Sequence, residues 1–599
     1  MANIKTTKIE SPFIVSINKK KIVFLLIAIL ILIWSFMSPP KRNADGLEYL
    51  AMTVSFANHF TPELTELDRN ISQSIASANN DKLNSEFPGY YQDKKSRYYS
   101  FHFWFYSLLC TPVYMILKIF NLNLLSSFQI TNCLLFLFAF YWTLFVSKLS
   151  DNLKIWLSSS LIFNPIVLYF NYTNPEVYSY VILYISLLAW LDEKRTLACA
   201  LSAIASFQNP AIAIITAYFG LKEIIKSIKL KKVQINFLWT FFSCSSVLFP
   251  YLWFYWHYSV FSLIGEKATN GISLDRALNL LFDLNMGLFL YIPLLLLVLM
   301  FLVYKKDIQA INFIVLIFLV ALVCSAQVNW NSAMAYINRY AVWMIPLAIV
   351  GSLSFITKLS RQRLIIFLVA FIFSTGSITV YCIATYKQFN YMLFSSVAKF
   401  VMAKTPALYN PPDELFIERI IGEEIGPNDA KKYLPIGVSN ESGIRKILTV
   451  EDGKIKYQNG RVVLSGQNFV HSLGTSTANN SIFKFSGMQF FDSGWTGMEL
   501  NKELFRWSKQ QSNTYFSTGK KEKVYITLDI ASYRKNRDCE IRLNDQLVFK
   551  DVIPIDHRKV RFEADLYMFN KLTIIANDDN NGGDLDIRFN VKNIELAKN

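Results

Sequence analysis

The stretch Ala44-Asp45-Gly46-Leu47-Glu48-Tyr49 follows directly after the first apolar run of the chain, Ile22 to Ser38. Lysines occupy positions 19–21, just before that run. Cytoplasmic flanks of membrane spans are rich in lysine and arginine, so the N-terminus is predicted to be cytoplasmic. Asp45 and Glu48 then emerge on the external side, close to the bilayer edge, and share one face if the segment is helical. Acids beside lipid are costly unless they have partners or a role, and the alternative interpretation is a hydrated polar loop.

The composition is that of a helical membrane protein. Of 599 residues, 53% are hydrophobic and only 17% are charged, and the mean hydropathy is +0.28. Apolar runs recur to about residue 386 and then stop. We therefore predict an α-helical polytopic membrane protein, with a cytoplasmic segment over residues 1–21, a membrane domain over residues 22–386 and a soluble region after it.

The net charge of +16 does not indicate a nucleic-acid-binding protein. Much of the basic charge lies in short loops beside apolar runs, as in Lys222 to Lys232 and Lys358 to Arg363, which is the positive-inside pattern of membrane proteins. Six of the seven cysteines fall in apolar segments, and the five histidines are scattered without metal-site spacing. The sequence therefore predicts no nucleic-acid partner, no disulfide framework in the tail and no protein-built metal cage.

The external loop after the first span is long, covering residues 39–123, and its last part can be placed in two ways. The apolar run Phe101 to Phe120 either spans the membrane or lies along its outer surface. The second arrangement puts two charged loops, 148–154 and 192–195, in the cytoplasm, where short basic loops belong, and we prefer it for that reason. It places Glu176 on the same external side as the first acids. The prediction is then about eleven spans, with the N-terminus inside and the C-terminus outside.

Two further polar features are predicted to lie on the external side. The apolar run Thr196 to Leu221 is broken at Gln208 and Asn209, which predicts a short helix pair with these two residues at its turn. Arg339, followed by Tyr340, opens a span that runs inward. Arg339 is either a flanking residue that snorkels to the surface or a clamp for phosphate, which a guanidinium binds in a bidentate manner.

The soluble tail divides into two parts. Residues 387–452 are polar and mixed, and are predicted to form an external linker with helices. Residues 453–599 contain short alternating runs separated by turn clusters, which is typical of β-strands. We interpret this part as a β-sandwich of jelly-roll type. The predicted strands are Arg461–Leu464, Val524–Leu528, Glu540–Leu543, Lys571–Ile575 and Asp586–Phe589.

The external polar residues together suit one reaction. A lipid carrier keeps its tail in the bilayer and its phosphate at the surface, where Arg339 would hold the phosphate as a leaving group. A nearby carboxylate would take the proton from an attacking hydroxyl group. This arrangement predicts transfer of a sugar by displacement at its anomeric carbon. Glu176 is a candidate acid for this site, although an acid in the first turn of a helix is also favourable without a catalytic role.

The order and sidedness of these motifs resemble those of the GT-C glycosyltransferases, polytopic enzymes that use polyprenyl-phosphate sugars. The family includes the protein O-mannosyltransferases and the lipid A aminoarabinose transferases. The stretch Ala44 to Leu50 is similar to their acidic first-loop motif, and Asn174-Pro175-Glu176 to their second external acid. The broken segment Ser206 to Pro210 is similar to their short helix pair, and Phe101 to Phe120 to their juxtamembrane helix. The resemblance covers roughly residues 20–386.

The resemblance implies a bacterial inner-membrane enzyme with a catalytic base at Asp45, supported by Glu48 and Glu176. It implies a polyprenyl-phosphate sugar as donor and an envelope glycan, lipid or protein as acceptor. Some family members need a divalent metal and others do not, so the metal requirement is unknown. The family often has lysine or glycine at the turn of the helix pair, where this chain differs. The residues assigned to donor phosphate and lipid are Arg339, Tyr340, Gln208 and Asn209.

Three aromatic residues are candidates for stacking on an acceptor or sugar ring: Tyr49, Trp495 and Trp507. The two tryptophans lie in motifs that resemble those of sandwich domains attached to envelope enzymes, and the alternative is that they are core aromatics. Two other functions fit the architecture, a transporter or flippase for lipid-linked sugars and a non-catalytic envelope assembly protein. The transporter is less well supported, because transport sites usually lie near the bilayer midplane and not at its external face.

Overall fold

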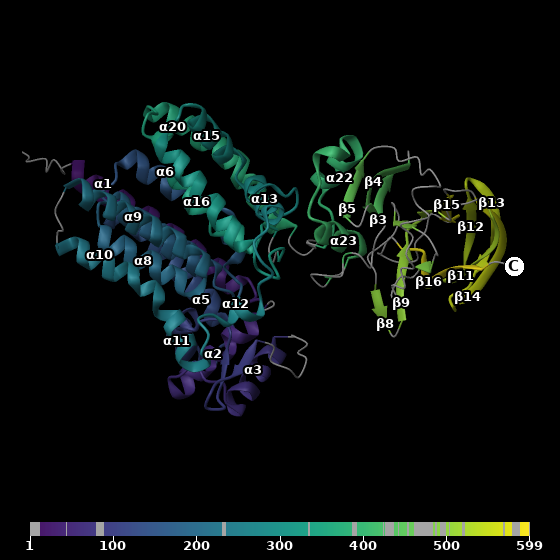
Figure 1. Ribbon diagram of the computed structural model, residues 1–599, viewed down its shortest axis with the longest axis horizontal. Helices are drawn as coiled ribbons and strands as arrows, with labels where there is room; N and C mark the ends of the chain where they lie inside the picture. The colour runs from purple at the N-terminus through teal and green to yellow at the C-terminus, as the bar shows by residue number, and fades with distance from the viewer. Residues whose placement is uncertain are drawn as a thin grey trace, which may run out of the picture. The chain divides into compact units, whose positions relative to one another are not determined.

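The computed structural model divides the chain into two compact units, which we call unit 1 (Met1–Phe389) and unit 2 (Asn390–Asn599) and describe separately (Figure 1). Over unit 1 and the start of unit 2 the structure describes residues 12–42, 45–79, 89–230, 235–332, 336–385 and 392–422. Over the rest of unit 2 it describes residues 424–425, 430, 436–440, 443–451, 454–459, 483–484, 488–491, 499–501, 503–517, 522–566, 570–577 and 587–597.

Unit 1 is built from helices and one short β-hairpin, β1 (Tyr90–Gln92) with β2 (Tyr98–Ser100). Its first helices are α1 (Pro12–Met37), α2 (Gly46–His59), α3 (Glu66–Ala78), α4 (Phe105–Ile119), α5 (Ser126–Tyr141), α6 (Asp151–Ile162), α7 (Glu176–Leu191), α8 (Arg195–Gln208) and α9 (Ala213–Leu230). The later helices are α10 (Ile235–Ser245), α11 (Phe249–Tyr258), α12 (Leu263–Lys267), α13 (Leu274–Phe282), α14 (Leu288–Tyr291), α15 (Pro293–Tyr304), α16 (Ile308–Cys324), α17 (Arg339–Val342), α18 (Ile345–Gly351), α19 (Leu353–Ile356), α20 (Arg361–Phe371) and α21 (Ser377–Ala384).

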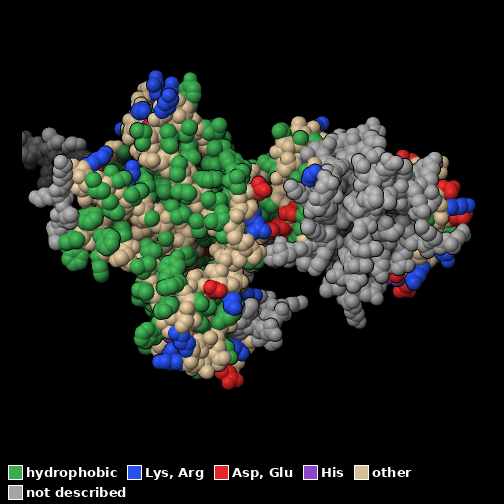
Figure 2. All heavy atoms as spheres, viewed as in Figure 1, with side chains coloured by type: hydrophobic (Ala, Val, Ile, Leu, Met, Phe, Trp, Pro, Cys, Tyr) green, Lys and Arg blue, Asp and Glu red, His purple; other side chains and the backbone are tan. Residues whose placement is uncertain are grey.

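Among the described residues of unit 1, four helical segments are long and apolar enough to cross a membrane: Ser126–Val146, Phe237–Tyr258, Arg339–Ile356 and Arg361–Ala384. Four shorter helices are also apolar, namely Phe105–Ile119, Glu176–Leu191, Pro293–Tyr304 and Ile308–Cys324. Figure 2 shows hydrophobic side chains over most of the visible surface of unit 1, with basic side chains gathered near α20. Such a surface is unstable in water and suits lipid. Unit 1 is therefore a helical membrane component, and the count of about eleven spans stays a prediction.

The elements that carry the external acids pack closely together. Helix α2 lies against α3 and α4, and α7 lies against α5 and α8. Residues Leu47 to Phe56 of α2 are all buried, and the hydroxyls of Thr53 and Ser55 donate to carbonyls one turn earlier at 2.8 and 2.9 Å. This back-bonding satisfies hydroxyl groups that have no access to water. The α2 backbone is thereby fixed inside the unit, and Asp45 stands at its start.

Unit 2 begins with α22 (Ser396–Lys404) and α23 (Asp413–Ile421) and continues as two β-sheets. One sheet has the order β13-β12-β15-β10-β7-β3-β4-β5, and the other has the order β14-β11-β16-β9-β8, with β6 beside β16. The strands are β3 (Ile436–Asn440), β4 (Gly443–Glu451), β5 (Lys454–Asn459), β6 (Phe483–Lys484), β7 (Met488–Phe491), β8 (Glu499–Asn501), β9 (Glu503–Ser508), β10 (Gln511–Ser517), β11 (Glu522–Ser532), β12 (Arg537–Leu543), β13 (Gln546–Ile553), β14 (Arg558–Leu566), β15 (Asn570–Ala576) and β16 (Phe589–Ala597).

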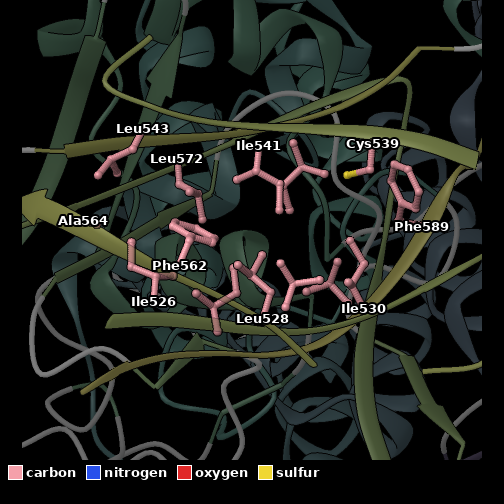
Figure 3. Packing of buried hydrophobic residues seen from close by; sticks show 14 of the residues in the cluster. Ile526, Leu528, Ile530, Cys539, Ile541, Leu543, Phe562, Ala564, Leu572 and Phe589 are labelled. Carbon is pink, nitrogen blue, oxygen red and sulfur yellow. The ribbon is translucent and has the colours of Figure 1, made fainter. Parts of the chain in front are cut away.

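The two sheets share one apolar core. Figure 3 shows Ile541 and Leu572 from one sheet pointing toward Leu528 and Phe562 from the other, and all four are buried. Strand β12 alternates between buried and less buried residues, which is the period-two pattern of a strand with one face in a core. A C-terminal region of β-sheet is therefore present.

Three of the five strands predicted from the sequence lie within strands of unit 2. The runs 524–528, 540–543 and 571–575 fall within β11, β12 and β15, whereas the run 461–464 lies outside the described residues and the run 586–589 is described only in part. Strands β3 and β4 belong to the larger sheet although they lie within residues 387–452, which the sequence assigned to a linker.

A buried carboxylate cluster as candidate active site

Asp45 stands at the start of α2 and faces a charged partner from the far end of unit 1. Its carboxylate makes no capping hydrogen bond to α2 and instead accepts one from Nη1 of Arg339 at 2.8 Å. Nε2 of His102 lies 3.4 Å from the same oxygen. Burial by itself would raise the pKa of Asp45, but the Arg339 guanidinium and the His102 ring outweigh burial and hold that pKa well below its usual range. Asp45 is therefore a carboxylate anion at neutral pH.

Glu48, one turn further along α2, has a very different environment. It is buried, and Ser100 Oγ, at the end of β2, donates to its Oε2 at 2.6 Å. A Cβ at Gly89 would stand 2.3 Å from Oε1, and Gly89 has a φ of +87°, so only glycine fits above this carboxyl group. Burial and the nearby charge of Asp45 raise the pKa of Glu48 to about 8, against an opposing effect of His102. Glu48 is therefore mostly protonated at neutral pH.

Glu176 is brought to the same place by pairing between two loops. Lys41 lies just after α1, and its backbone N–H donates to the carbonyl of Asn171 at 2.7 Å. The backbone carbonyl of Lys41 accepts from the N–H of Thr173 at 3.1 Å. This pairing sets the start of α7 beside the start of α2. Glu176 is buried and interacts electrostatically with Arg339 and Asp45. The structure thus brings together the three acids that the sequence singled out.

Tyr49 and the turn between α8 and α9, which form the predicted helix pair, also lie beside the acids. The Tyr49 ring lies 5.3 Å from the His102 ring, and its hydroxyl accepts a long hydrogen bond, 3.5 Å, from Nε2 of Gln208. Gln208 ends α8, and its Oε1 accepts from the N–H of Tyr106 at 3.2 Å. Asn209 donates to the hydroxyl of Ser179 on α7. The turn of the helix pair is therefore next to the acids.

Arg339 is held in place at the start of α17. The side chain of Asn338 caps this turn by accepting from the N–H of Tyr340 at 2.8 Å. Nη2 of Arg339 donates to the Tyr340 hydroxyl at 2.9 Å, and the guanidinium lies 4.9 Å from the centre of that ring. The Arg339 side chain is only 10% exposed. A snorkelling side chain keeps its charged end in contact with water, so this burial speaks against the snorkelling interpretation.

Several buried polar atoms of the cluster have no hydrogen-bond partner among the described residues. They are Oγ1 of Thr173, both amide atoms of Asn174, Oε2 of Glu176 and Nε of Arg339. A buried polar group without a partner costs about 1–3 kcal/mol, and native structures contain few such groups. Their concentration around Asp45 indicates a place where a ligand or ordered water completes the hydrogen bonding.

The same residues include a donor set for a metal ion. One ligand atom each from Asp45, Glu48 and His102 lies within 4.8 Å of the others. Two carboxylates and an imidazole suit zinc or a similar divalent ion. The sequence predicted no metal cage, because His102 is far from both acids in the chain and follows no spacing motif. His102 is thus a candidate site residue that sequence reasoning missed, as are Ser100 and Gly89.

A second Asp–Arg–His cluster lies at the turn of the β1–β2 hairpin. The N–H groups of Lys95 and Arg97 donate to Oδ1 of Asp93 at 2.8 and 2.9 Å, and the Arg97 guanidinium donates to Oδ2 at 2.8 Å. His257, near the end of α11, places Nδ1 3.0 Å from Oδ2. The hydroxyl of Tyr258 also donates to the carbonyl of Tyr91 at 2.8 Å. These bonds fasten the hairpin to α11.

The other residues named from the sequence lie elsewhere or outside the described part of the chain. Trp507 lies in β9 of unit 2, half-buried, with its ring 5.3 Å from that of Tyr533. Trp495 lies outside the described residues.

Comparisons with known proteins provide little information. No protein-family model matches the chain, and no curated protein matches it. Among solved structures, the chain is similar to a family 35 carbohydrate-binding module from an environmental isolate, with 14% sequence identity and a TM-score of 0.15. That match covers 18% of this chain and 93% of the module. At this TM-score the similarity carries no argument about fold or function.

Proposed function

We propose that this protein is a glycosyltransferase of the GT-C type, which moves a sugar from a polyprenyl-phosphate donor to a glycan, lipid or protein of the bacterial cell envelope. The observation that carries the proposal is the ion pair between Asp45 and Arg339, 2.8 Å long and surrounded by buried polar atoms without partners. A carboxylate base and a cation for a phosphate are the two groups that this reaction needs. Asp45 follows the first apolar segment of the chain, and Arg339 opens a later one.

The proposed mechanism begins with an exchange of partners at Arg339. The donor phosphate binds the guanidinium and the Tyr340 hydroxyl, and Arg339 is drawn away from Asp45. Loss of that cation raises the proton affinity of Asp45. The acceptor hydroxyl then attacks the anomeric carbon while Asp45 takes its proton. The bond from that carbon to the phosphate oxygen breaks, and the electron pair leaves with the phosphate on Arg339.

Other residues of the cluster support these steps. Glu48, protonated at neutral pH, and Glu176 bind hydroxyl groups of the sugar or acceptor, together with the amides of Gln208 and Asn209. Tyr49 provides a ring at the inner wall against which a sugar face stacks. Asp45, Glu48 and His102 would hold a divalent ion if the reaction uses one, and such an ion would supply positive charge for the phosphate.

The proposal includes the finer architecture predicted from the sequence: about eleven spans, a cytoplasmic N-terminus and an external jelly-roll sandwich. Impermeant labelling of single cysteines in spheroplasts tests its sidedness. Ser96 at the hairpin turn and Asp151 at the start of α6 are both exposed, whereas six of the seven native cysteines are buried. We expect Ser96→Cys to label and Asp151→Cys to label only after lysis. The reverse pattern would contradict the topology.

The experiment that tests the function is an acceptor-dependent cleavage assay. Purified protein in detergent or nanodiscs is incubated with a polyprenyl-phosphate sugar and an envelope extract as acceptor. We expect free polyprenyl phosphate to appear together with a glycosylated acceptor, and neither product to form with the Asp45→Asn variant. Movement of intact donor between leaflets without cleavage would contradict the enzyme and favour the flippase.

A further inference from the structure

Helix α22 of unit 2 has one face in the protein and one face exposed. Ala398 and Met402, four residues apart, are buried, and the helix packs against β4. Val397, Phe400 and Lys404, spaced by three and four residues, share the opposite face. Phe400 is 65% exposed and Val397 is 45% exposed. A single exposed apolar side chain is ordinary, but several grouped together mark a surface that contacts a membrane or another protein.

The exposed apolar side chains extend beyond both ends of the helix. Leu393 before it is 41% exposed, and Leu408 after it is 79% exposed. We call these two residues, with Val397 and Phe400, the α22 patch. Figure 2 shows hydrophobic and basic side chains close together in this part of unit 2. The α22 patch is therefore a group of four exposed apolar residues and not a single one.

The charged residues within the stretch that carries the patch are of one sign. Residues 392–408 include Lys399 and Lys404 and no aspartate or glutamate. Both lysines are exposed, one on each side of Phe400 in the sequence. Basic side chains beside exposed apolar ones are typical of helices that lie in a membrane interface, where lysines contact anionic lipid headgroups.

Few residues separate α22 from the last candidate span in the chain. The last candidate span ends at Ala384, and α22 begins at Ser396. Twelve residues of fully extended chain reach at most about 40 Å, and Leu393 comes three residues earlier than the helix. A bilayer surface is therefore within reach of the patch whatever path the intervening residues take.

We propose that the α22 patch docks on the lipid surface, with its apolar side chains among the headgroups and acyl chain ends and with Lys399 and Lys404 on anionic headgroups. The docking holds unit 2 beside the membrane. It does not depend on the enzymatic activity proposed above, since the residues involved belong to unit 2 and not to the Asp45 cluster. A protein surface is the competing occupant, and it would bury the same side chains without exposing them to lipid.

Fluorescence quenching by lipids in the full-length protein tests the proposal. Phe400→Cys and Leu408→Cys variants carry an environment-sensitive dye and are placed in nanodiscs that contain phosphatidylglycerol, with or without lipids that bear a quencher near the headgroup. Ile555→Cys is the matched control, because Ile555 is also an exposed apolar residue of unit 2, at 54%. We expect the quencher lipid to reduce emission at least twofold at positions 400 and 408 and to leave position 555 unchanged.

Two results would overturn the inference. One is a blue-shifted dye at position 400 that the quencher lipid does not affect, which indicates a protein surface as the occupant. The other is equal quenching, or no quenching, at positions 400 and 555. A Lys399→Gln, Lys404→Gln double variant tests the role of charge. We expect it to lose the increase in quenching that anionic lipid produces, and an unchanged dependence on anionic lipid would overturn the headgroup contact.

Discussion

Two clusters in unit 1 contain the same three residue types and serve different purposes. The Asp45 cluster consists of Asp45, His102 and Arg339, and the Asp93 cluster consists of Asp93, Arg97 and His257. In both, a carboxylate lies within 3.0 Å of a guanidinium nitrogen and close to an imidazole. In both, burial works against ionisation and the surrounding hydrogen bonds and charges outweigh it, so the pKa of the aspartate is lowered.

The two clusters differ in how many of their buried polar atoms lack a hydrogen-bond partner. Both oxygens of Asp93 are occupied by two N–H groups, a guanidinium and a histidine. Around Asp45, by contrast, buried polar atoms of Asn174, Glu176 and Arg339 have no hydrogen-bond partner among the described residues, and the two buried acids Glu48 and Glu176 lie at the site. A completed set of hydrogen bonds stabilises a fold, whereas an incomplete set costs free energy unless a ligand completes it. The hydrogen bonds of the Asp93 cluster therefore stabilise the fold, and the Asp45 cluster is the one at which we propose that a ligand binds.

The largest effect is expected from Asp45→Asn. This change keeps the size of the side chain but removes the charge and the proton acceptor. We expect turnover measured below the unfolding temperature to fall by at least about 10²-fold, which is typical of lost general base catalysis. The unfolding temperature should fall as well, because Arg339 loses its buried anion. Steady-state kinetics and unfolding monitored by tryptophan fluorescence measure the two quantities. Normal turnover of this variant would remove Asp45 from the mechanism.

Arg339→Ala is expected to weaken donor binding most. The guanidinium is the proposed phosphate partner, and a charge-assisted hydrogen bond contributes about 1.5–3 kcal/mol, so affinity should fall roughly 10- to 100-fold. Titration with polyprenyl phosphate measures it. Because loss of a buried cation also destabilises the fold, Arg339→Lys is the control, which keeps the charge but not the bidentate geometry. Unchanged affinity in both variants would contradict the phosphate clamp.

Asp93→Asn is the structural counterpart of Asp45→Asn. It leaves Arg97 and His257 without their anion, and we expect the free energy of unfolding to fall by about 1–3 kcal/mol. Turnover measured well below the unfolding temperature should stay close to that of the wild type. Since the pKa of Asp93 is lowered in the folded state, the stabilisation is present at neutral pH and declines only in acid. A variant that is stable but inactive would show that the Asp93 cluster has a catalytic role.

Glu48→Gln is expected to have the smallest effect on activity, and its effect on stability should depend on pH. The pKa of Glu48 is about 8 when folded and about 4.3 when unfolded, so between these values only the folded protein holds the proton. The free energy of unfolding of the wild type therefore falls as the pH rises through this window. Glutamine does not titrate, so the variant should gain stability relative to the wild type between pH 5 and pH 8.5.

This prediction is tested by measuring the unfolding temperature and the turnover of the variant and the wild type at pH 5 and at pH 8.5. We expect turnover to fall by less than about tenfold, because glutamine resembles the protonated acid. A stability difference that is the same at both pH values would contradict the protonated state. Complete loss of turnover at both pH 5 and pH 8.5 would instead indicate that Glu48 ionises to bind a metal ion.

Much of the candidate site could be predicted because its residues interrupt apolar segments. Asp45 and Glu48 stand out after the first span, Arg339 opens another, and Gln208 and Asn209 break a third. Such polar residues are visible in one sequence because the lipid-facing runs around them set a uniform background. The alternation of Val524 to Leu528 likewise indicated a strand, since a strand with one buried face has a period of two.

The partners of these residues could not be predicted. Arg339 reaches Asp45 across 294 positions of the chain, and Ser100 reaches Glu48 across 52. No local pattern encodes such contacts, because they depend on how α2, α17 and the hairpin pack. The sequence placed Arg339 and Asp45 on one side of the membrane but did not indicate that they form an ion pair. His102 could not be predicted for the same reason. It belongs to the site only because the end of the hairpin places its ring beside Asp45.

The most direct test of the account is a cryo-EM map of the protein with polyprenyl phosphate bound in nanodiscs. The account predicts density for the phosphate within hydrogen-bonding distance of the Arg339 guanidinium and the Tyr340 hydroxyl. It also predicts that the 2.8 Å contact between Arg339 and Asp45 is lost in the complex, while the Asp93 cluster is unchanged. Phosphate density at another site, with the Asp45–Arg339 contact intact, would contradict the central claim.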